Sequence, residues 1–396
     1  MTKKTDTPAI RFKGFSDTWE QRKLSEIADK VTEKNAGLHY IETFTNSAEF
    51  GIISQRDFFD HDIAKMSSLG GYYIVRNEDF VYNPRISTSA PVGPINRNKL
   101  GRIGVMSPLY TVFRPHDVDT TYLEYFFKSK YWHSFMNFNG DSGARSDRFS
   151  IKDSVFFEMP IPLPYIEEQR KIGEHLTQLD HLITLHQRKY EKLHNIKKSM
   201  LEKMFPKNGS NVPEIRFKGF TEAWEQRKLS EIADKVTEKN SGLQYVETFT
   251  NSAEFGIISQ RDFFDHDIAK LSSLDGYYIV KNEDFVYNPR ISTCAPVGPI
   301  NRNKLGRTGV MSPLYTVFRP HDVDTTYLEH FFKCAYWHSF MNFNGDSGAR
   351  SDRFSIKNDV FFQMPIPLPH IDEQRKIGEL LTYLDNLITL HQRKEK

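Results

Sequence analysis

The sequence predicts an α+β protein, built from two similar mixed α/β modules that are separated by long helices. Residues 10–189 recur at 215–394, 205 positions later, with about nine positions in ten identical. Each copy begins with short apolar and aromatic runs between turn residues, and then changes to a long segment of helical spacing. The repeat is therefore a duplication of one large unit and not a solenoid of short repeats.

The first part of each copy mixes strand and helix signals. In the first copy, the runs GYYIV, DFVYNP, LYTVFRP and VFFEMPIPLP alternate with the longer segment TTYLEYFFKSKYWHSFM. The short runs predict strands, and the longer segment predicts a helix. We place the two modules at residues 1–164 and 207–369.

The segment at 165–206 has no proline between the Pro-x-Pro that ends the first module and Pro206, its last residue. Its apolar and aromatic residues fall at alternating steps of three and four, which is typical of a coiled-coil seam. The seam residues are Ile172, Leu176, Leu179, Ile183, His186, Tyr190, Leu193, Met200 and Met204, and they recur at Ile377, Leu381, Leu384, Ile388 and His391. Leu182, Leu185 and Ile196 add a second stripe, which indicates more than one packing partner.

Two like seams can bury each other. We therefore expect the helices at 165–206 and 370–396 to form an antiparallel coiled coil, and to relate the modules by a pseudo-two-fold axis. The alternative is that each helix covers only its own module.

Composition indicates a soluble globular chain with 26% charged residues and a net charge of +2. No apolar run approaches the roughly 18 residues of a membrane span, and the start lacks the apolar core of a signal peptide. We expect a cytoplasmic protein without membrane contact. Cys294 and Cys334 correspond to Ser89 and Ser129 in the first copy, so the two cysteines predict free thiols and no shared disulfide or metal site.

The motifs of common catalytic sites are missing. The chain contains no Gly-Lys, no Gly-x-Gly and no Asp/Glu-x-Lys, which are typical of nucleotide loops and nuclease sites. The string Tyr82-Asn83-Pro84-Arg85 is similar to the Asn-Pro-Pro-aromatic motif of amino-methyltransferases, but Arg85 and Ile86 replace its last two residues. We expect no catalytic residue and no metal site, and we interpret His133, His338, His186 and His391 as structural.

A long interval without acidic residues is the best candidate for binding a polyanion. No Asp or Glu occurs between Asp79 and Asp117, or between Asp284 and Asp322. Arg and Lys can pair phosphates or read guanine, and Asn can read adenine. The candidate residues are Asn83, Arg85, Ser87, Thr88, Asn96, Arg97, Asn98, Lys99 and Arg102 in the first copy, and Asn288, Arg290, Asn301, Arg302, Asn303, Lys304 and Arg307 in the second. Arg114 and Arg319 also lie in these intervals.

A second candidate is the glycine-rich loop at 139–152, which is identical to 344–357. Its polar and basic residues are Arg145, Ser146, Arg148 and Lys152, repeated as Arg350, Ser351, Arg353 and Lys357. The alternative is that these loops are solvated and have no partner.

Motifs at the start and end of each module carry a family resemblance. The first module opens with Phe12-Lys13-Gly14-Phe15, Trp19-Glu20 and Lys23-Leu24 and exits through Glu168-Gln169-Arg170-Lys171-Ile172, a motif repeated at Glu373-Gln374-Arg375-Lys376-Ile377. In this order, across nearly the whole chain, the motifs resemble those of the specificity subunit of type I restriction-modification enzymes.

The resemblance implies that each module is a target recognition domain that reads one half of a split site in double-stranded DNA. It also implies that the helices dock methyltransferase subunits, two in number, together with restriction/translocase subunits. S-adenosylmethionine, ATP and magnesium would belong to those partners, with no cofactor in this chain. Because the two modules are near copies, whereas the family's usually differ, we expect a palindromic target. The alternatives are a coiled-coil scaffold without DNA specificity and a cryptic nuclease or methyltransferase.

Overall fold

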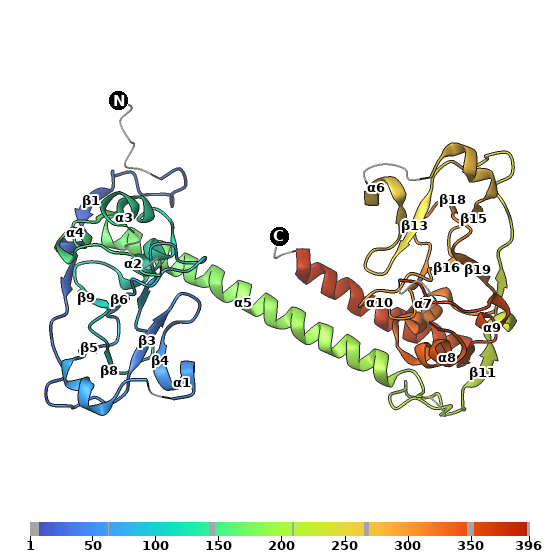
Figure 1. The fold of residues 1–396 in the computed structure, drawn as a ribbon, viewed down its shortest axis with the longest axis horizontal. Coiled ribbons are helices and arrows are strands. Elements are labelled where there is room, and N and C mark those ends of the chain that lie inside the picture. Colours follow the sequence, from blue (N-terminus) through green and yellow to red (C-terminus); the bar gives the residue numbers. More distant parts are fainter. Residues whose placement is uncertain are drawn as a thin grey trace. The chain divides into compact units, whose positions relative to one another are not determined.

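The chain folds into two compact units, Met1–Leu182 and Ile183–Lys396. Their structure is a computed structural model that describes residues 8–61, 63–141, 147–207, 210–264, 269–346 and 352–393. One continuous helix, α5 (Ile166–Lys203), contains the boundary between the units (Figure 1). Each unit holds one module, so the predicted α+β architecture with two similar modules is confirmed.

The first module contains small antiparallel sheets in place of one large one. The largest has four strands in the order β2-β9-β6-β7, and three two-stranded pairs, β1-β10, β3-β4 and β5-β8, surround it. The strands are β1 (Glu20–Lys23), β2 (Ala28–Lys30), β3 (Phe44–Ser47), β4 (Gly51–Ser54), β5 (Tyr73–Val75), β6 (Phe80–Tyr82), β7 (Ile95–Arg97), β8 (Gly104–Met106), β9 (Thr111–Pro115) and β10 (Pro160–Leu163).

Short helices complete the module. They are α1 (Gln55–Phe59), α2 (Thr120–Lys128), α3 (His133–Asn139), α4 (Asp153–Phe156), and the 3-10 turns η1 (Leu24–Glu26) and η2 (Met66–Gly71). Asp119 caps α2 by accepting a hydrogen bond from the Tyr122 amide at 2.9 Å. Figure 1 places α2, α3 and α4 around the start of α5, and α1 at the opposite end of the module.

The second module repeats these elements in the same order and register. Its strands are β11 (Glu225–Lys228), β12 (Ala233–Lys235), β13 (Phe249–Ser252), β14 (Gly256–Ser259), β15 (Tyr278–Val280), β16 (Phe285–Tyr287), β17 (Ile300–Arg302), β18 (Gly309–Met311), β19 (Thr316–Pro320) and β20 (Pro365–Leu368). Its helices are η3 (Leu229–Glu231), α6 (Gln260–Phe264), η4 (Leu271–Gly276), α7 (Thr325–Lys333), α8 (Tyr336–Asn344), α9 (Asn358–Phe361) and α10 (Ile371–Arg393).

An aromatic core joins the four-stranded sheet to the helices. In the first module, Phe80 and Phe113 stack at 5.5 Å, and Phe127 of α2 contacts both rings. Phe285, Phe318 and Phe332 repeat this cluster in the second module. Because these rings are almost fully buried, they fix α2 and α7 against their sheets.

The exit motif locks each long helix onto its module. Glu168 is fully buried and receives two hydrogen bonds from Arg11, at 2.7 and 2.8 Å. Gln169 accepts a hydrogen bond from the Asp119 amide and donates one to the Pro164 carbonyl. The same bonds recur around Glu373 and Gln374. The Glu-Gln pair therefore sets the direction in which each long helix leaves its module.

Within the second unit, the C-terminal half of α5 packs antiparallel against α10, which confirms the predicted coiled coil. Leu193, Ile196 and Met200 lie against the core that contains Ile377 and Leu381. Lys197 forms an ion pair with Asp385, and His186 Nδ1 lies 3.2 Å from His391 Nδ1. Residue 186 thus lies opposite 391, and residue 197 lies opposite 385. Residue numbers increase along one helix as they decrease along the other, so the two helices are antiparallel.

The seam residues that the two helices share have different surroundings. Leu384 and Ile388 of α10 are 7% and 9% exposed, whereas their counterparts on α5, Leu179 and Ile183, are 41% and 52% exposed. Equivalent residues of the two helices therefore differ in burial, because in the second unit the later turns of α5 cover the seam of α10.

Candidate nucleic-acid interface

Most basic side chains of the predicted acid-free interval are paired inside the module. Arg97 bonds Glu78 and Glu124, Lys99 bonds Glu124, and Arg102 bonds Glu42 in a fork at 2.8 to 3.1 Å. Arg114 binds both carboxylate oxygens of Asp79 at 2.8 Å. The same pairs recur at Arg302, Lys304, Arg307 and Arg319.

Acidic residues that lie outside the interval in sequence supply these partners. Burial alone would raise the pKa of Glu124, but the Lys99 hydrogen bond and the charges of Arg97 and Lys128 lower it overall. Its counterpart Glu329 has a pKa lowered to about 2 by the surrounding basic residues, again against the effect of burial. These carboxylates stay ionised and hold their basic partners within the module.

The amides of the interval are also used internally. Asn98 is fully buried and donates to the Arg76 and Arg102 carbonyls. Asn96 donates to the side chain of Asn46, and Asn83 donates to the Asn46 carbonyl. Asn288, Asn301 and Asn303 repeat these bonds. The geometry gives these amides a role in holding the loop, and their predicted base contacts stay predictions.

Arg85 and Arg148 are arranged differently. Their backbones form an antiparallel bridge, flanked by hydrogen bonds from the Ile86 amide to the Asp147 carbonyl and from the Phe149 amide to the Pro84 carbonyl, at 3.0 and 2.7 Å. Both side chains are exposed, and within the described ranges no ion pair holds either of them. Arg290 and Arg353 form the same bridge in the second module. The bridge thus joins the two predicted basic loops into one surface.

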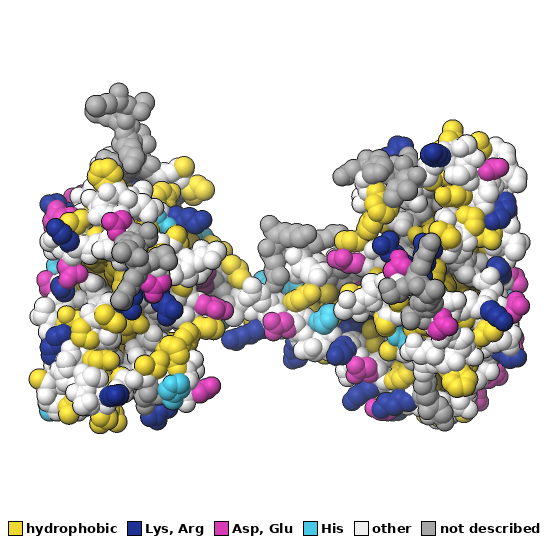
Figure 2. Space-filling view, in the orientation of Figure 1, with side chains coloured by type: hydrophobic (Ala, Val, Ile, Leu, Met, Phe, Trp, Pro, Cys, Tyr) yellow, Lys and Arg dark blue, Asp and Glu magenta, His cyan; other side chains and the backbone are white. Residues whose placement is uncertain are grey.

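The other predicted residues lie around this bridge. Ser87, Thr88, Lys152 and Lys357 are exposed. Arg145, Ser146, Arg350 and Ser351 lie outside the described residues. On the face of each unit drawn in Figure 2, Lys and Arg side chains alternate with Asp and Glu side chains. On this face, a polyanion would therefore bind at particular side chains and not on one broad basic surface.

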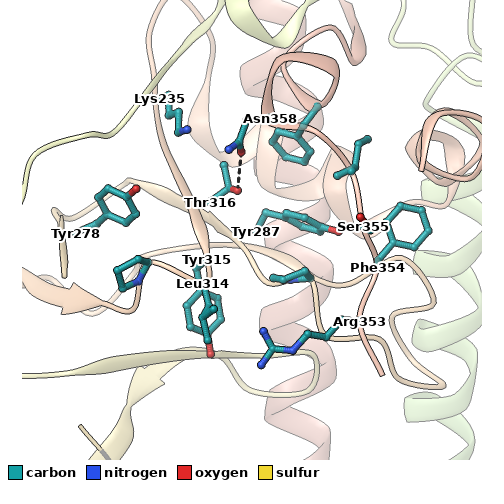
Figure 3. Close-up of a pocket in the computed structure, with 14 residues that line it drawn as sticks. Lys235, Tyr278, Tyr287, Leu314, Tyr315, Thr316, Arg353, Phe354, Ser355 and Asn358 are labelled. Atoms are coloured by element: carbon teal, nitrogen blue, oxygen red, sulfur yellow. Dashed lines mark hydrogen bonds between the residues drawn. The ribbon is translucent and has the colours of Figure 1, made fainter. Parts of the chain in front are cut away.

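A cavity opens beside each bridge. In the second module it has a volume of about 490 Å³ and contains Lys235, Tyr278, Tyr315 and Arg353 (Figure 3). The first module has a matching cavity of about 510 Å³ with Lys30, Tyr73, Tyr110 and Arg148. Sequence reasoning found the arginines but missed the other three residues, because they come from separate strands and loops. The only sequence signal was their repetition, which they share with most of the chain.

Within the described ranges, no three His, Cys, Asp or Glu side chains gather in a way that could hold a metal ion. The helices in the described part of the chain include none long and apolar enough to cross a membrane. As predicted, both cysteines are free: Cys294 is exposed and Cys334 is buried.

Comparison with known proteins shows which family has this arrangement. Residues 16–195 and 221–396 each match the family model described as "Type I restriction modification DNA specificity domain". The "Type I restriction enzyme MjaVIII specificity subunit" of Methanocaldococcus jannaschii is 28% identical over 75% of this chain and 71% of its own length. The "Putative type I restriction enzyme MjaX specificity subunit" of the same organism is 27% identical over 62% of this chain and 57% of its own length.

A solved structure has the same fold. The crystal structure of the "Type-I restriction-modification system S subunit from M. genitalium" superposes with a TM-score of 0.52 and covers 98% of this chain and 94% of its own. Its sequence is 11% identical, so the likeness lies in the fold alone.

Proposed function

The chain belongs to the family of type I restriction-modification specificity subunits, and on this premise we propose that it reads a split DNA target whose two halves have the same sequence. Specificity subunits are the non-catalytic DNA-recognition components of their complexes. The observation that carries the proposal is the repeated arginine bridge: Arg85 with Arg148, and Arg290 with Arg353. Arg85, Arg148 and Arg290 are exposed and Arg353 is partly exposed, and none of them pairs with a carboxylate of the described residues. Such arginines can pair phosphates or the O6 and N7 atoms of guanine.

The relative direction of the two half-sites follows from the helices. Within the second unit α5 and α10 run antiparallel, and antiparallel packing of like helices supports a two-fold relation between like modules. Under such a relation, the second module reads the opposite strand. We therefore expect an inverted repeat around a non-specific spacer, whose length depends on the helices.

The test is to sequence the methylated sites of a host that expresses this chain with its modification partner. An inverted repeat of one half-site supports the proposal. Two unrelated half-sites, or a direct repeat, would contradict it. A gel shift at graded salt distinguishes the remaining alternative, a scaffold without DNA specificity, because a scaffold would show no preference for the methylated sequence.

We also propose that α5 provides a docking surface for the methyltransferase subunits, two per chain. Leu182 and Leu185, two of the three residues of the second stripe, are 49% and 53% exposed, and adjacent apolar side chains on a helix surface are typical of protein contacts. The restriction/translocase subunits would join the same complex. Replacing both leucines with Ser should reduce co-purification of the methyltransferase subunit, whereas the distant pair Ser67→Ala and Ser68→Ala should not.

S-adenosylmethionine, ATP and magnesium would enter with those partner subunits. The purified chain should neither methylate nor cut DNA when these compounds are added. Methyl transfer should require the modification subunit. Activity of the chain alone would show that it contains an unrecognised catalytic site.

A further inference from the structure

The two cavities beside the arginine bridges differ at one lining position. Thirteen positions line both cavities, and twelve of them hold the same residue type in the two modules. The exception is Asp153 in the first module, which corresponds to Asn358 in the second. The difference is therefore a carboxylate that is present in one cavity and absent from the other.

In the first module this carboxylate neutralises a cavity lysine. Asp153 forms an ion pair with Lys30 and accepts a hydrogen bond from Thr111 at 3.3 Å. Asn358 keeps the corresponding hydrogen bond, accepted from Thr316 at 3.2 Å. An amide carries no charge, and within the described ranges Lys235 has no carboxylate partner.

In the second module, a carboxylate occurs one residue later in the sequence than in the first module. Position 154 is serine, but its counterpart is Asp359, which is exposed and does not line the cavity. The two modules thus carry the same charge over this pair of positions, and only the placement of the carboxylate differs. An exposed carboxylate outside the cavity is screened by solvent and salt, and it leaves the lysine available to another anion.

The lining of the second cavity suits a phosphodiester. Figure 3 shows Lys235 and Arg353 on opposite sides of Tyr287 and Thr316. Arg offers a planar fork for two phosphate oxygens, and Lys offers a compact charge with rotatable donors. Arg353 also belongs to the bridge with Arg290, so the cavity adjoins the surface proposed to read DNA.

We infer that the second module binds a backbone phosphate of duplex DNA between Lys235 and Arg353, and that Asp153 weakens the matching contact in the first module. The inference rests on the proposed function. A phosphate in the first cavity must compete with Asp153 for the Lys30 ammonium. The two modules then read the same bases, but the second holds the duplex more tightly and with a steeper salt dependence.

The chain itself offers matched variants. Asn358→Asp with Asp359→Ser gives the second module the arrangement of the first, and Asp153→Asn with Ser154→Asp does the reverse. Both double variants keep the net charge, and both use residues that the twin module already carries in the same fold. Glu158→Gln is the control, because it removes an acid that pairs with Lys23 outside the cavity, at a position where the second module has Gln363.

The measurement is the affinity of the full chain for a fluorescent 40-base-pair duplex of random sequence, titrated between 50 and 200 mM salt. Each phosphate contact adds about 0.9 to the slope of log affinity against log salt, which is about threefold in affinity over this range. The salt slope of the Asn358→Asp/Asp359→Ser variant should become shallower, by at most the amount that one phosphate contact contributes. The salt slope of the Asp153→Asn/Ser154→Asp variant should become steeper by at most the same amount. Glu158→Gln should leave the slope unchanged.

Two single variants provide an independent comparison. Lys235→Gln should flatten the salt slope more than Lys30→Gln, and thermal melts identify any variant that has not folded. Equal effects of the two lysines, or unchanged slopes in both double variants, would overturn the inference while leaving DNA recognition intact. Equal competition by an RNA duplex would overturn the assignment to DNA. If the wild-type chain binds no DNA at all, the proposed function itself fails.

Discussion

Arg97 Nη2 lies 2.6 Å from Glu124 Oε2, and only 9% of either side chain is exposed. The same guanidinium also donates to Glu78, Thr120 and Thr121 at 2.8 to 3.2 Å. It joins strand β7 to helix α2, and Arg302 repeats the arrangement in the second module. The sequence predicts Arg97 as a DNA contact because it lies in the acid-free interval. In the structure, this arginine holds the sheet and α2 of the first module together.

Replacing Arg97 with Ala should therefore unfold the first module more easily. Removing one partner of a buried ion pair leaves an uncompensated charge and costs about 3–5 kcal/mol. The measurement is urea unfolding of the full chain, with Arg85→Ala as the control. Arg85 is exposed, and its replacement should change the free energy of unfolding by less than about 0.5 kcal/mol. Normal stability of the Arg97 variant combined with weak DNA binding would favour the original interpretation of Arg97 as a DNA contact.

The different burial of the two seams predicts unequal effects of the same substitution. Leu384→Ala removes a side chain that α5 helps to bury, so it should destabilise the second unit by about 2–5 kcal/mol. Leu179→Ala, at the same position of the repeat, removes a side chain that is 41% exposed, and should cost less than about 1 kcal/mol. Chemical unfolding of both variants under the same conditions measures the difference. Equal losses would mean that the seam of α5 is covered in solution.

The seam comparison also shows which parts of the fold could be predicted from sequence. Spacing predicted both long helices within a few residues of their observed bounds, α5 and α10. It also predicted that they pair. The spacing did not predict which turns of the two helices lie opposite each other. Leu193 and Met200, which supply the contact with α10, follow the repeated part of α5. Matching seams indicate that helices can pack, but the lengths of the helices decide which turns meet.

The candidate site was harder to predict, for a physical reason. The acid-free interval is a local property of the sequence, whereas ion pairing is a property of the fold. Glu42 and Glu124 lie outside the interval, yet β-strand pairing and α2 bring them to Arg102 and Arg97. Among the basic residues of the interval and its twin, all of which the structure describes, only Arg85 and Arg290 keep the exposed, unpaired character that the interval suggested.

His330 predicts a pH-dependent stability for the second unit. Burial lowers its pKa from 6.5 to about 3, although Glu329 and Asp385 oppose this shift; Lys333 and Lys197 add to it. The unfolded chain therefore binds a proton below pH 6.5 that the folded chain does not bind until about pH 3. The contribution of His330 to the free energy of unfolding is therefore fully present above pH 6.5. It is lost as the pH falls, by about 2–3 kcal/mol at pH 4.5.

The measurement is the free energy of unfolding of the second unit at pH 7.5 and pH 4.5. His330→Gln removes the titrating group and should reduce the difference between the two values. The first module has Tyr125 at the matching position, so its unfolding transition serves as an internal comparison. A pH dependence that is unchanged in His330→Gln would assign the effect to other groups.

The two cysteines should react with thiol reagents at very different rates. Cys334 is buried and donates a hydrogen bond to the Phe331 carbonyl at 2.8 Å, and burial raises its pKa to about 12. Cys294 is exposed, and the thiolate is the reactive form of a thiol. At pH 8 the folded chain should therefore take up one equivalent of iodoacetamide, at Cys294, and a second only after unfolding. Cys294→Ser, which introduces the residue of the first module, should leave the folded chain unlabelled in intact-mass measurements. Rapid labelling of Cys334 in that variant would show that the packing around the end of α7 opens in the native state, because the core that contains Cys334 covers this thiol in the folded chain.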